Sequence, residues 1–182
     1  MSKNITIFCA SKKGNSEIIN KAVIQFCDLL IKNDFDLVYG GSHYGMMGMI
    51  AKRFLENGRK VIGVRPKHFI RGENFKGDIT EMIVTENMSE RKRKMLEMAD
   101  AVIALPGGIG TLDEITETQC HFAIHKIEKF VGILNCNHFY DGLLQHYHNM
   151  EMFGFSSKTF TQRLAVESDP IIMVRRILEH PK

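Results

Sequence analysis

The chain has few of the features that mark secreted, membrane-spanning or metal-binding proteins. Its four cysteines, Cys9, Cys27, Cys120 and Cys136, lie far apart without a CxxC pair, so neither a disulfide scaffold nor a zinc site is expected. No apolar run has the length needed to cross a bilayer, and the N-terminus lacks a signal-peptide pattern. The net charge of +3 is too small to indicate a nucleic-acid partner. We therefore expect a cytoplasmic protein that binds neither membrane nor nucleic acid.

Two common nucleotide-binding signatures are absent as well. The first strand-like run ends at Cys9, and the loop 10–15 that follows it contains one glycine and no GxGxxG, which argues against a conventional dinucleotide fold. The chain also has no GxxxxGK(S/T), which excludes a P-loop NTPase on motif grounds.

The 182 residues do contain a regular alternation of strand-like and helical segments, with 44% hydrophobic and 25% charged residues. The expected strands are Ile5–Cys9, Phe35–Tyr39, Lys60–Val64, Glu81–Thr85, Asp100–Leu105, Lys129–Leu134 and Leu164–Val166. The first expected helix begins after the N-cap Ser16, and the last runs from the N-cap Asp169 to about Glu179. Between them, helices are expected at about Gly45–Asn57, Ser89–Met98, Leu112–Lys126 and Tyr140–Met150. This order predicts one domain, 1–182, of the α/β class, with a doubly wound parallel sheet and helices on both faces. Ligands bind such sheets beyond the carboxyl ends of the strands.

The most informative stretch is the glycine-rich loop Leu105-Pro106-Gly107-Gly108-Ile109-Gly110-Thr111-Leu112-Asp113-Glu114, which joins a buried strand to a helix. Three glycines allow a tight turn and a close approach of a ligand to the backbone. The helix N-terminus then offers unpaired amides that favour an anion such as a phosphate, with Asp113 and Glu114 nearby. This loop predicts chemistry on a phosphorylated small molecule. The alternative is that Thr111-x-x-Glu114 is only a capping box.

A second glycine loop, 39–48, follows the strand Phe35–Tyr39 and leads into a helix. Its glycines Gly40, Gly41 and Gly45 can bring further backbone amides to the same ligand. The alternative is a tight turn with close packing of the helix on the strand.

Four cations stand at the start of one expected helix, in Ser89-Glu90-Arg91-Lys92-Arg93-Lys94, where their charge opposes the helix dipole. A solvated basic turn is the usual explanation, but the unfavourable placement suggests that one or two of them meet an anionic ligand. His121 and His125, with Glu117 one turn earlier, have the spacing of metal ligands. No third ligand is evident, so ordinary histidines are the better interpretation.

Together these motifs resemble the LOG family of cytokinin riboside 5′-monophosphate phosphoribohydrolases, often labelled lysine decarboxylases. The resemblance is carried by Pro-Gly-Gly-x-Gly-Thr-x-x-Glu at 106–114, by Met88-x-x-Arg91-Lys92-x-x-Met95 and by Tyr39-Gly40-Gly41 to Gly48, and it runs from about Ile5 to Leu144. It implies a homodimer of Rossmann-like, doubly wound α/β subunits that splits the N-glycosidic bond of a nucleoside 5′-monophosphate, without a metal or cofactor. The products would be a free base and ribose 5-phosphate.

By that resemblance Arg91 and Glu114 are the catalytic pair. The implied substrate-binding residues are Glu73, Lys92, Gly107, Gly108, Ile109, Gly110, Thr111, Leu112 and Asp113, together with Gly40, Gly41 and Gly45 of the second loop. The carboxylate of Glu114 can stabilise oxocarbenium character on the ribose while it orients or deprotonates water. The amides of 108–111 would hold the 5′-phosphate, and Arg91 would either anchor the substrate or orient Glu114.

The chain departs from the family pattern at several positions. Ser42, Ser89, Ile109 and Phe130 replace a usual Gly, His, Tyr and Pro, and Cys120, His121, Ala123 and His125 stand where the family carries Thr, Trp, Gln and Gly. Because the phosphate and catalytic positions are kept, the reaction type is expected to hold, with cytokinin riboside 5′-monophosphate, AMP or another nucleotide as substrate. The alternative function is a carrier of a nucleotide or of a molybdenum cofactor on the same fold. A pyridoxal-phosphate-dependent lysine decarboxylase is set aside, because no lysine has a context suited to a Schiff base.

Overall fold

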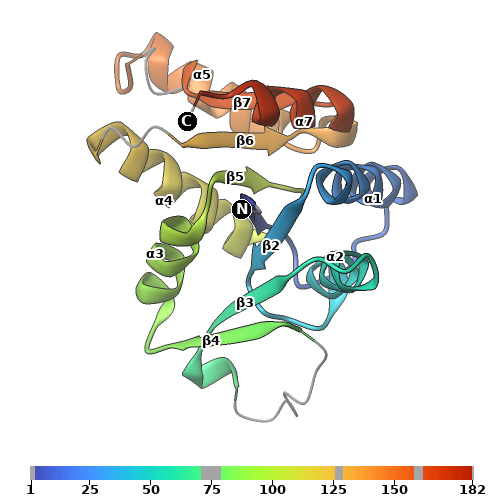
Figure 1. Cartoon of the computed structure of the whole chain (residues 1–182). Helices are drawn as coiled ribbons and strands as arrows, with labels where there is room; N and C mark the ends of the chain where they lie inside the picture. Colours follow the sequence, from blue (N-terminus) through green and yellow to red (C-terminus); the bar gives the residue numbers. More distant parts are fainter. Residues whose placement is uncertain (1–2, 71–78, 126–128, 158–161, 182) are drawn as a thin grey trace.

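The computed structural model describes residues 3–70, 79–125, 129–157 and 162–181, and at its centre lies a parallel sheet (Figure 1). The strand order across the sheet is β4-β3-β2-β1-β5-β6-β7. The strands are β1 Lys3–Phe8, β2 Phe35–Tyr39, β3 Val61–Pro66, β4 Glu81–Thr85, β5 Ala101–Ala104, β6 Phe130–Leu134 and β7 Leu164–Glu167. Every predicted strand is present, with ends that differ by no more than about two residues, the usual scatter of such boundaries.

Helices cover both faces of the sheet (Figure 1). One face carries α1 Glu17–Lys32, α2 Gly45–Glu56 and α7 Pro170–Glu179, and the other carries α3 Met88–Met98, α4 Ile109–His125 and α5 Asp141–Met152. Two single-turn 3-10 helices, η1 Lys67–Phe69 and η2 Cys136–His138, lie in the connections. The predicted doubly wound α/β fold is confirmed.

The core follows from the apolar strands and one apolar stripe on each helix. Every residue of β2 and β6 is buried, as expected for strands covered on both faces. On α1 the buried side chains Val23, Phe26 and Leu30 recur at helical spacing.

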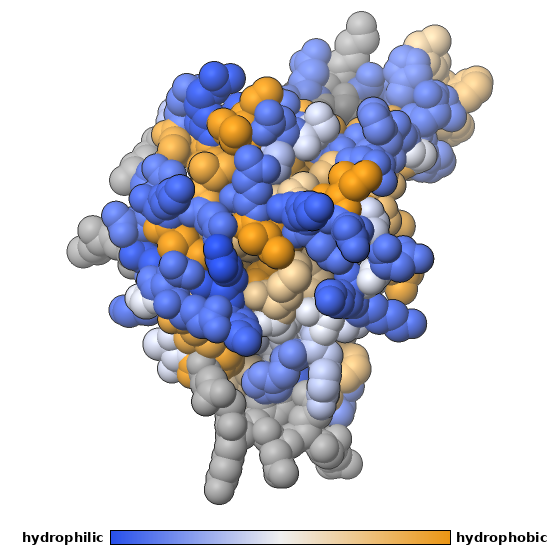
Figure 2. Space-filling view, turned by 90° about the vertical axis from the view of Figure 1, so that its right-hand side faces the viewer, coloured by the Kyte–Doolittle hydropathy of each residue, from blue (hydrophilic) through white to orange (hydrophobic). Residues whose placement is uncertain are grey.

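The outer surface on the side of α1 and α2 is mostly hydrophilic, with apolar side chains scattered between charged ones (Figure 2). Within the described residues, no helix has both the length and the apolar character needed to cross a membrane.

The helix ends match their capping residues. The Ser16 hydroxyl accepts a hydrogen bond from the Ile19 amide (3.3 Å), and the Asp169 carboxylate accepts one from Ile171 (2.7 Å), as predicted. Helix α3 begins one residue before its predicted start, because Asn87 is its cap and accepts from the Glu90 amide (2.9 Å). Helix α4 begins at Ile109, three residues before the predicted Leu112.

The strand order creates a switch point beside β1. From β1 the chain builds β2, β3 and β4 on one side and then returns to place β5 on the other side. Phe8 pairs with Ala104 of β5, and Ile7 pairs with Tyr39 of β2, so β1 ends between these two strands. The two glycine loops therefore leave the same edge of the sheet on either side of β1, where ligands bind in such folds.

Candidate active site

The N-terminus of α4 presents free backbone donors at this edge. In the described part of the chain, the amides of Gly108, Ile109, Gly110 and Thr111 have no hydrogen-bond partner, whereas the Leu112 amide donates to the Gly108 carbonyl (3.1 Å). A helix N-terminus with open amides and a positive dipole end is a ready anion site. This is the geometry that the glycine-rich loop predicts for a phosphate.

Packing within the chain explains why one of the three residues in this loop is glycine, but not the other two. A Cβ on Gly107 would lie 2.1 Å from the Thr111 hydroxyl oxygen, so packing within the chain requires glycine there. A Cβ on Gly108 or Gly110 would meet no atom within 4 Å. Neither of these two residues has a positive φ, so nothing in the folded chain itself demands glycine at either position. A close approach by a ligand is a reason that remains.

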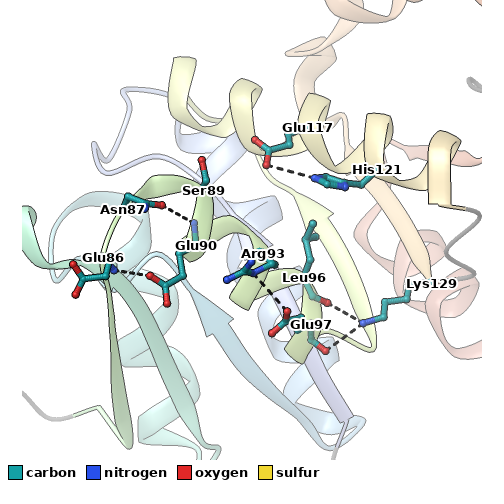
Figure 3. A pocket seen from close by; sticks show the side chains of 10 residues that line it. All are labelled: Glu86, Asn87, Ser89, Glu90, Arg93, Leu96, Glu97, Glu117, His121 and Lys129. Atoms are coloured by element: carbon teal, nitrogen blue, oxygen red, sulfur yellow. Dashed lines mark hydrogen bonds and ion pairs between the residues drawn. The ribbon is translucent and has the colours of Figure 1, made fainter.

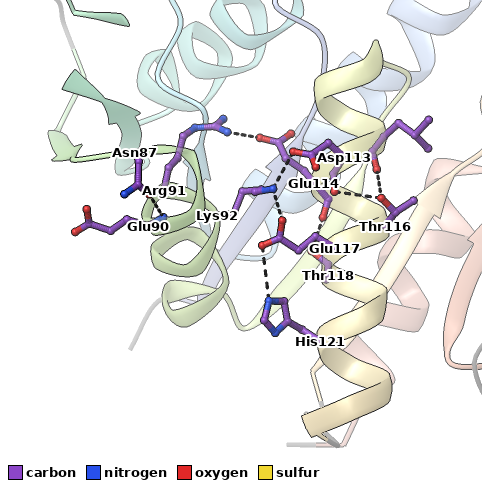
Figure 4. A network of polar contacts seen from close by, with 11 residues as sticks. Asn87, Glu90, Arg91, Lys92, Asp113, Glu114, Thr116, Glu117, Thr118 and His121 are labelled. Atoms are coloured by element: carbon purple, nitrogen blue, oxygen red, sulfur yellow. Dashed lines mark hydrogen bonds and ion pairs between the residues drawn. The ribbon is translucent and has the colours of Figure 1, made fainter. Parts of the chain in front are cut away.

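The capping-box alternative for Thr111-x-x-Glu114 is wrong. Because α4 begins at Ile109, Thr111 lies inside the first turn rather than at the N-cap. Glu114 makes its contact elsewhere: its carboxylate accepts a hydrogen bond from Arg91 of α3, with 2.5 Å between Oε1 and Nη1 (Figure 4).

Arg91 and Glu114 form a buried ion pair between α3 and α4. Their side chains are 6% and 4% exposed, so both charges are almost fully removed from water. Arg91 also donates from Nε to the Val64 carbonyl at the end of β3 (3.0 Å). A Cβ on Gly40 would lie 2.4 Å from Arg91 Nη2, so the first glycine of the second loop makes room for the guanidinium. Contacts with α4 and β3, and the space left by Gly40, thus hold this one cation in place.

Burial raises the pKa of Glu114 above its ordinary value, more than the Arg91 charge and hydrogen bond lower it. A carboxylate that is costly to ionise and sits beside a fixed cation is typical of catalytic sites. The pair therefore differs from a surface salt bridge, which contributes little to stability, and it is a candidate for the reacting groups.

Lys92 lies in the same interface between α3 and α4 as the Arg91–Glu114 pair (Figure 4). Its ammonium contacts the carboxylates of Asp113 (2.9 Å) and of Glu117, and His121 lies 3.7 Å from Glu117. Burial alone would lower the pKa of Lys92, but hydrogen bonds to Glu117 and Asp113 raise it overall, so the cation is stabilised. The contact between Glu117 and Lys92 was not expected from the sequence, although Glu117 stands one turn after Glu114.

Backbone amides after the second glycine loop donate to carbonyls within the chain, so they are not free to bind a ligand as the sequence suggests. The amides of Met46 and Met47 at the start of α2 donate to the carbonyls of Lys12 (3.3 Å) and Ala10 (3.2 Å). Gly45 has a φ of +63°, and a Cβ there would lie 2.2 Å from the Ser11 carbonyl oxygen. Close packing of α2 against the loop after β1 accounts for these contacts.

The four cations of the basic turn have different surroundings. Arg91 and Lys92 are buried and paired with carboxylates of α4, so a solvated turn is wrong for these two residues, and their contact with an anionic ligand stays a prediction. The Arg93 side chain is 71% exposed, and Lys94 is half-buried. Among the described residues, no group of three or more His, Cys, Asp or Glu side chains is arranged to hold a metal. Glu73 and the side chain of His125 lie outside what the structure describes.

A cavity opens next to this network, between α3 and α4 (Figure 3). Its volume is about 700 Å³. The lining side chains are Glu86, Asn87, Ser89, Glu90, Arg93, Leu96, Glu97, Glu117, His121 and Lys129. Two of the family departures, Ser89 and His121, therefore face one cavity, although they lie on different helices. Of the others, Ile109 and Cys120 are exposed and Phe130 is buried in the core.

Comparisons with known proteins identify relatives of the chain. A family model described as "Possible lysine decarboxylase" matches residues 47–177. Cytokinin riboside 5′-monophosphate phosphoribohydrolase LOG2 of Arabidopsis thaliana is 37% identical over 179 residues, which cover 97% of this chain and 83% of that protein. The phosphoribohydrolase LOG7 of the same plant is 36% identical over 180 residues, covering 98% of this chain and 82% of that protein.

Solved structures share the fold. The molybdenum cofactor carrier protein of Chlamydomonas reinhardtii superposes with a TM-score of 0.70 at 19% identity, covering 98% of this chain and 99% of that chain. At this identity the likeness concerns the fold alone. The family model and the relatives at more than a third identity go further: the chain belongs to the LOG family of cytokinin riboside 5′-monophosphate phosphoribohydrolases.

Proposed function

We propose that this protein is a phosphoribohydrolase that cleaves the N-glycosidic bond of a nucleoside 5′-monophosphate to a free base and ribose 5-phosphate. The observation that carries the proposal is the buried Arg91–Glu114 pair beside the open N-terminus of α4. An anion site and a carboxylate of raised pKa, held a fixed distance apart on one helix, suit a phosphorylated sugar whose bond breaks at the carboxylate. The names of the Arabidopsis thaliana relatives support the same reaction.

The spacing along α4 fits such a substrate. Glu114 follows Ile109 by five residues, or about 7.5 Å of helix at 1.5 Å per residue. A phosphate held by the amides of Gly108 to Thr111 would place the ribose alongside the first turns of α4. The anomeric carbon then comes within reach of Glu114, and this fixed geometry lowers the entropy cost of reaction.

In the proposed reaction Glu114 acts as a carboxylate. Cleavage leaves positive charge on the ribose ring, which the carboxylate stabilises while it orients or deprotonates the attacking water. The C1′–N bond breaks and its electron pair leaves with the base, while the water oxygen forms the new bond to C1′. The proton that the water loses ends on the base nitrogen, so the products are a neutral base and ribose 5-phosphate. Arg91 keeps Glu114 aimed at this position and limits how far burial can raise its pKa.

Lys92, the lysine beside the Arg91–Glu114 pair, gives no support to the lysine decarboxylase label of the family model. A Schiff base requires a neutral amine, whereas the contacts of Lys92 with Glu117 and Asp113 raise its pKa and keep it charged. We also propose that the protein acts in the cytoplasm and as a homodimer, with AMP as one substrate to be tested. Light scattering of the purified protein tests the dimer, and a monomeric mass would refute it.

The test of the proposed reaction is release of a free base. Purified protein is incubated with AMP, isopentenyl-AMP, GMP and CMP, and the products are separated by chromatography. We expect base release by the wild type and a loss of at least about a thousandfold in Glu114→Gln, because the transition-state charge then loses its carboxylate. Arg91→Ala should show a comparable loss. Absence of release from every nucleotide by folded protein, with binding retained, would instead favour a carrier.

A further inference from the structure

The glycine-rich loop that leads into α4 is anchored by a residue that follows the neighbouring strand. The Tyr140 hydroxyl donates a hydrogen bond to the carbonyl oxygen of Leu105 (2.7 Å), the residue that links β5 to the loop. Tyr140 comes after β6, which pairs with β5 in the sheet (Figure 1). The two residues are 35 positions apart in the sequence, so their contact depends on the adjacency of these strands.

The Leu105 carbonyl controls the direction in which the loop leaves the sheet. Its oxygen belongs to the planar peptide bond between Leu105 and Pro106, so a fixed oxygen fixes that plane. Pro106 has no amide hydrogen with which it could secure the turn. The Leu105 amide donates to the Phe8 carbonyl at the end of β1 (2.9 Å). Leu105 is thus held between β1 and Tyr140, three residues before the first open amide at Gly108.

A tight turn between β6 and α5 holds Tyr140 itself in place. The Tyr140 amide donates to the side-chain oxygen of Asn135 (2.7 Å), and Asn135 Nδ2 donates to Asp141 Oδ1 (2.7 Å). Asn137 and His138 have positive φ values of +54° and +58°, and His138 Nδ1 lies 3.1 Å from Asp141 Oδ2. Left-handed conformations are costly for residues other than glycine, and they persist where the surrounding contacts enforce them. These contacts fix the backbone from which the Tyr140 side chain extends, at the N-cap of α5.

The Tyr140 hydroxyl remains a hydrogen-bond donor. Tyr140 is 5% exposed, and burial raises its pKa above the ordinary value, while the nearby Cys9 and Glu114 add to this effect. Its single proton is directed at the Leu105 carbonyl. The hydroxyl is therefore suited to holding the loop rather than to transferring a proton.

We propose that Tyr140 is a positioning residue for the phosphate site. Its hydrogen bond to Leu105 sets the direction of the glycine-rich loop and so holds the amides of 108–111 where they bind the 5′-phosphate. The inference rests on the proposed phosphoribohydrolase function, because it uses the same phosphate position. It adds a residue that acts on substrate binding through Leu105.

The test removes the hydroxyl and keeps the ring, in Tyr140→Phe. Kinetics of base release from AMP should show a KM raised about tenfold, because the phosphate is held less well. The kcat should change by less than about threefold, because Arg91 still holds Glu114. Titration calorimetry with ribose 5-phosphate should show a similar loss of affinity, since this ligand keeps the phosphate without the base.

Tyr147→Phe is the matched control. Tyr147 of α5 is also 5% exposed, and its hydroxyl donates to the side-chain oxygen of Gln119 (2.5 Å), in the body of α4. Each substitution deprives one buried oxygen of this donor, so both should lower the melting temperature by a similar amount, about 2–8 °C. Only Tyr140→Phe should weaken the binding of AMP and ribose 5-phosphate.

The outcomes separate this inference from the proposed reaction. A KM for AMP that is unchanged in Tyr140→Phe, or raised equally in Tyr147→Phe, would overturn the positioning role and leave the hydrolase standing. Absence of base release by the wild type, with AMP binding weakened by Tyr140→Phe alone, would overturn the hydrolase and support the positioning role. If the wild type bound neither AMP nor ribose 5-phosphate, both would be refuted.

Discussion

Gly110 offers a perturbation in which stability and ligand binding are expected to move in opposite directions. It is the second residue of α4, it is not in a left-handed conformation, and a Cβ there would meet no atom within 4 Å. A glycine in a helix that needs neither conformational freedom nor space is a destabilising choice for the fold alone. We therefore expect that the substitution Gly110→Ala stabilises the free protein.

The size of the gain follows from helix propensity. Alanine is favoured over glycine by about 0.5–1 kcal/mol in a helix, partly because the unfolded chain loses conformational freedom. For a protein of this length, that corresponds to a rise of about 1–4 °C in the melting temperature. If the amides of Gly108 to Thr111 hold a phosphate, the new methyl group lies in the path of the ligand. Loss of one charge-assisted hydrogen bond, about 1.5–3 kcal/mol, would then weaken AMP binding by at least about tenfold.

The chain contains a matched control for this experiment. Gly142 is likewise the second residue of its helix, α5, and a Cβ there would also meet no atom within 4 Å. Gly142→Ala should raise the melting temperature by a similar amount and leave AMP binding unchanged. Calorimetric melting of the free proteins and titration with AMP give the two quantities for both variants.

Two results would contradict the expected behaviour of Gly110→Ala. A lower melting temperature for Gly110→Ala than for the wild type would mean that the fold itself requires glycine at this position. Unchanged AMP affinity in Gly110→Ala, with intact stability, would mean that the ligand does not approach the N-terminus of α4 closely. The phosphate position would then have to be abandoned.

Three further predictions concern the same edge of the sheet. Burial raises the pKa of Glu114, and the reaction needs its carboxylate, so kcat/KM should fall on acidification. The midpoint of this fall should lie above the ordinary pKa of an exposed glutamate. A pH profile that rises toward acid would instead assign Glu114 the role of a general acid. Gly40→Ala should lower kcat/KM at least about tenfold by displacing Arg91, because Arg91 Nη2 would lie 2.4 Å from the new Cβ. Circular dichroism should show an intact fold. Full activity would mean that the position of the guanidinium is unimportant for the reaction. Gly45→Ala should destabilise the protein by about 1–3 kcal/mol in urea unfolding, because it combines a φ of +63° with a Cβ 2.2 Å from the Ser11 carbonyl oxygen; an unchanged midpoint would contradict this packing.

Much of the fold was predictable because local patterns and the global architecture agree. Apolar runs buried on both faces, such as Phe35–Tyr39, leave little choice but a parallel sheet covered by helices. Caps such as Ser16 and Asp169 identify helix starts from chemistry alone. The start of α4 was predicted too late, since glycines have low helix propensity and concealed the first turn.

The elements, their alternation and the residue types at the glycine loops depend on neighbours along the chain, so they can be predicted from the sequence. Which charges meet depends instead on how distant elements pack in three dimensions. Arg91 and Glu114 lie 23 residues apart, and their contact arises because α3 and α4 pack side by side on one face of the sheet. The same packing encloses the cavity that Ser89 and His121 share, and it buries Lys92 against Glu117. Periodicity specifies which face of a helix is apolar, but pairing between polar side chains on two helices depends on how those helices are placed in space.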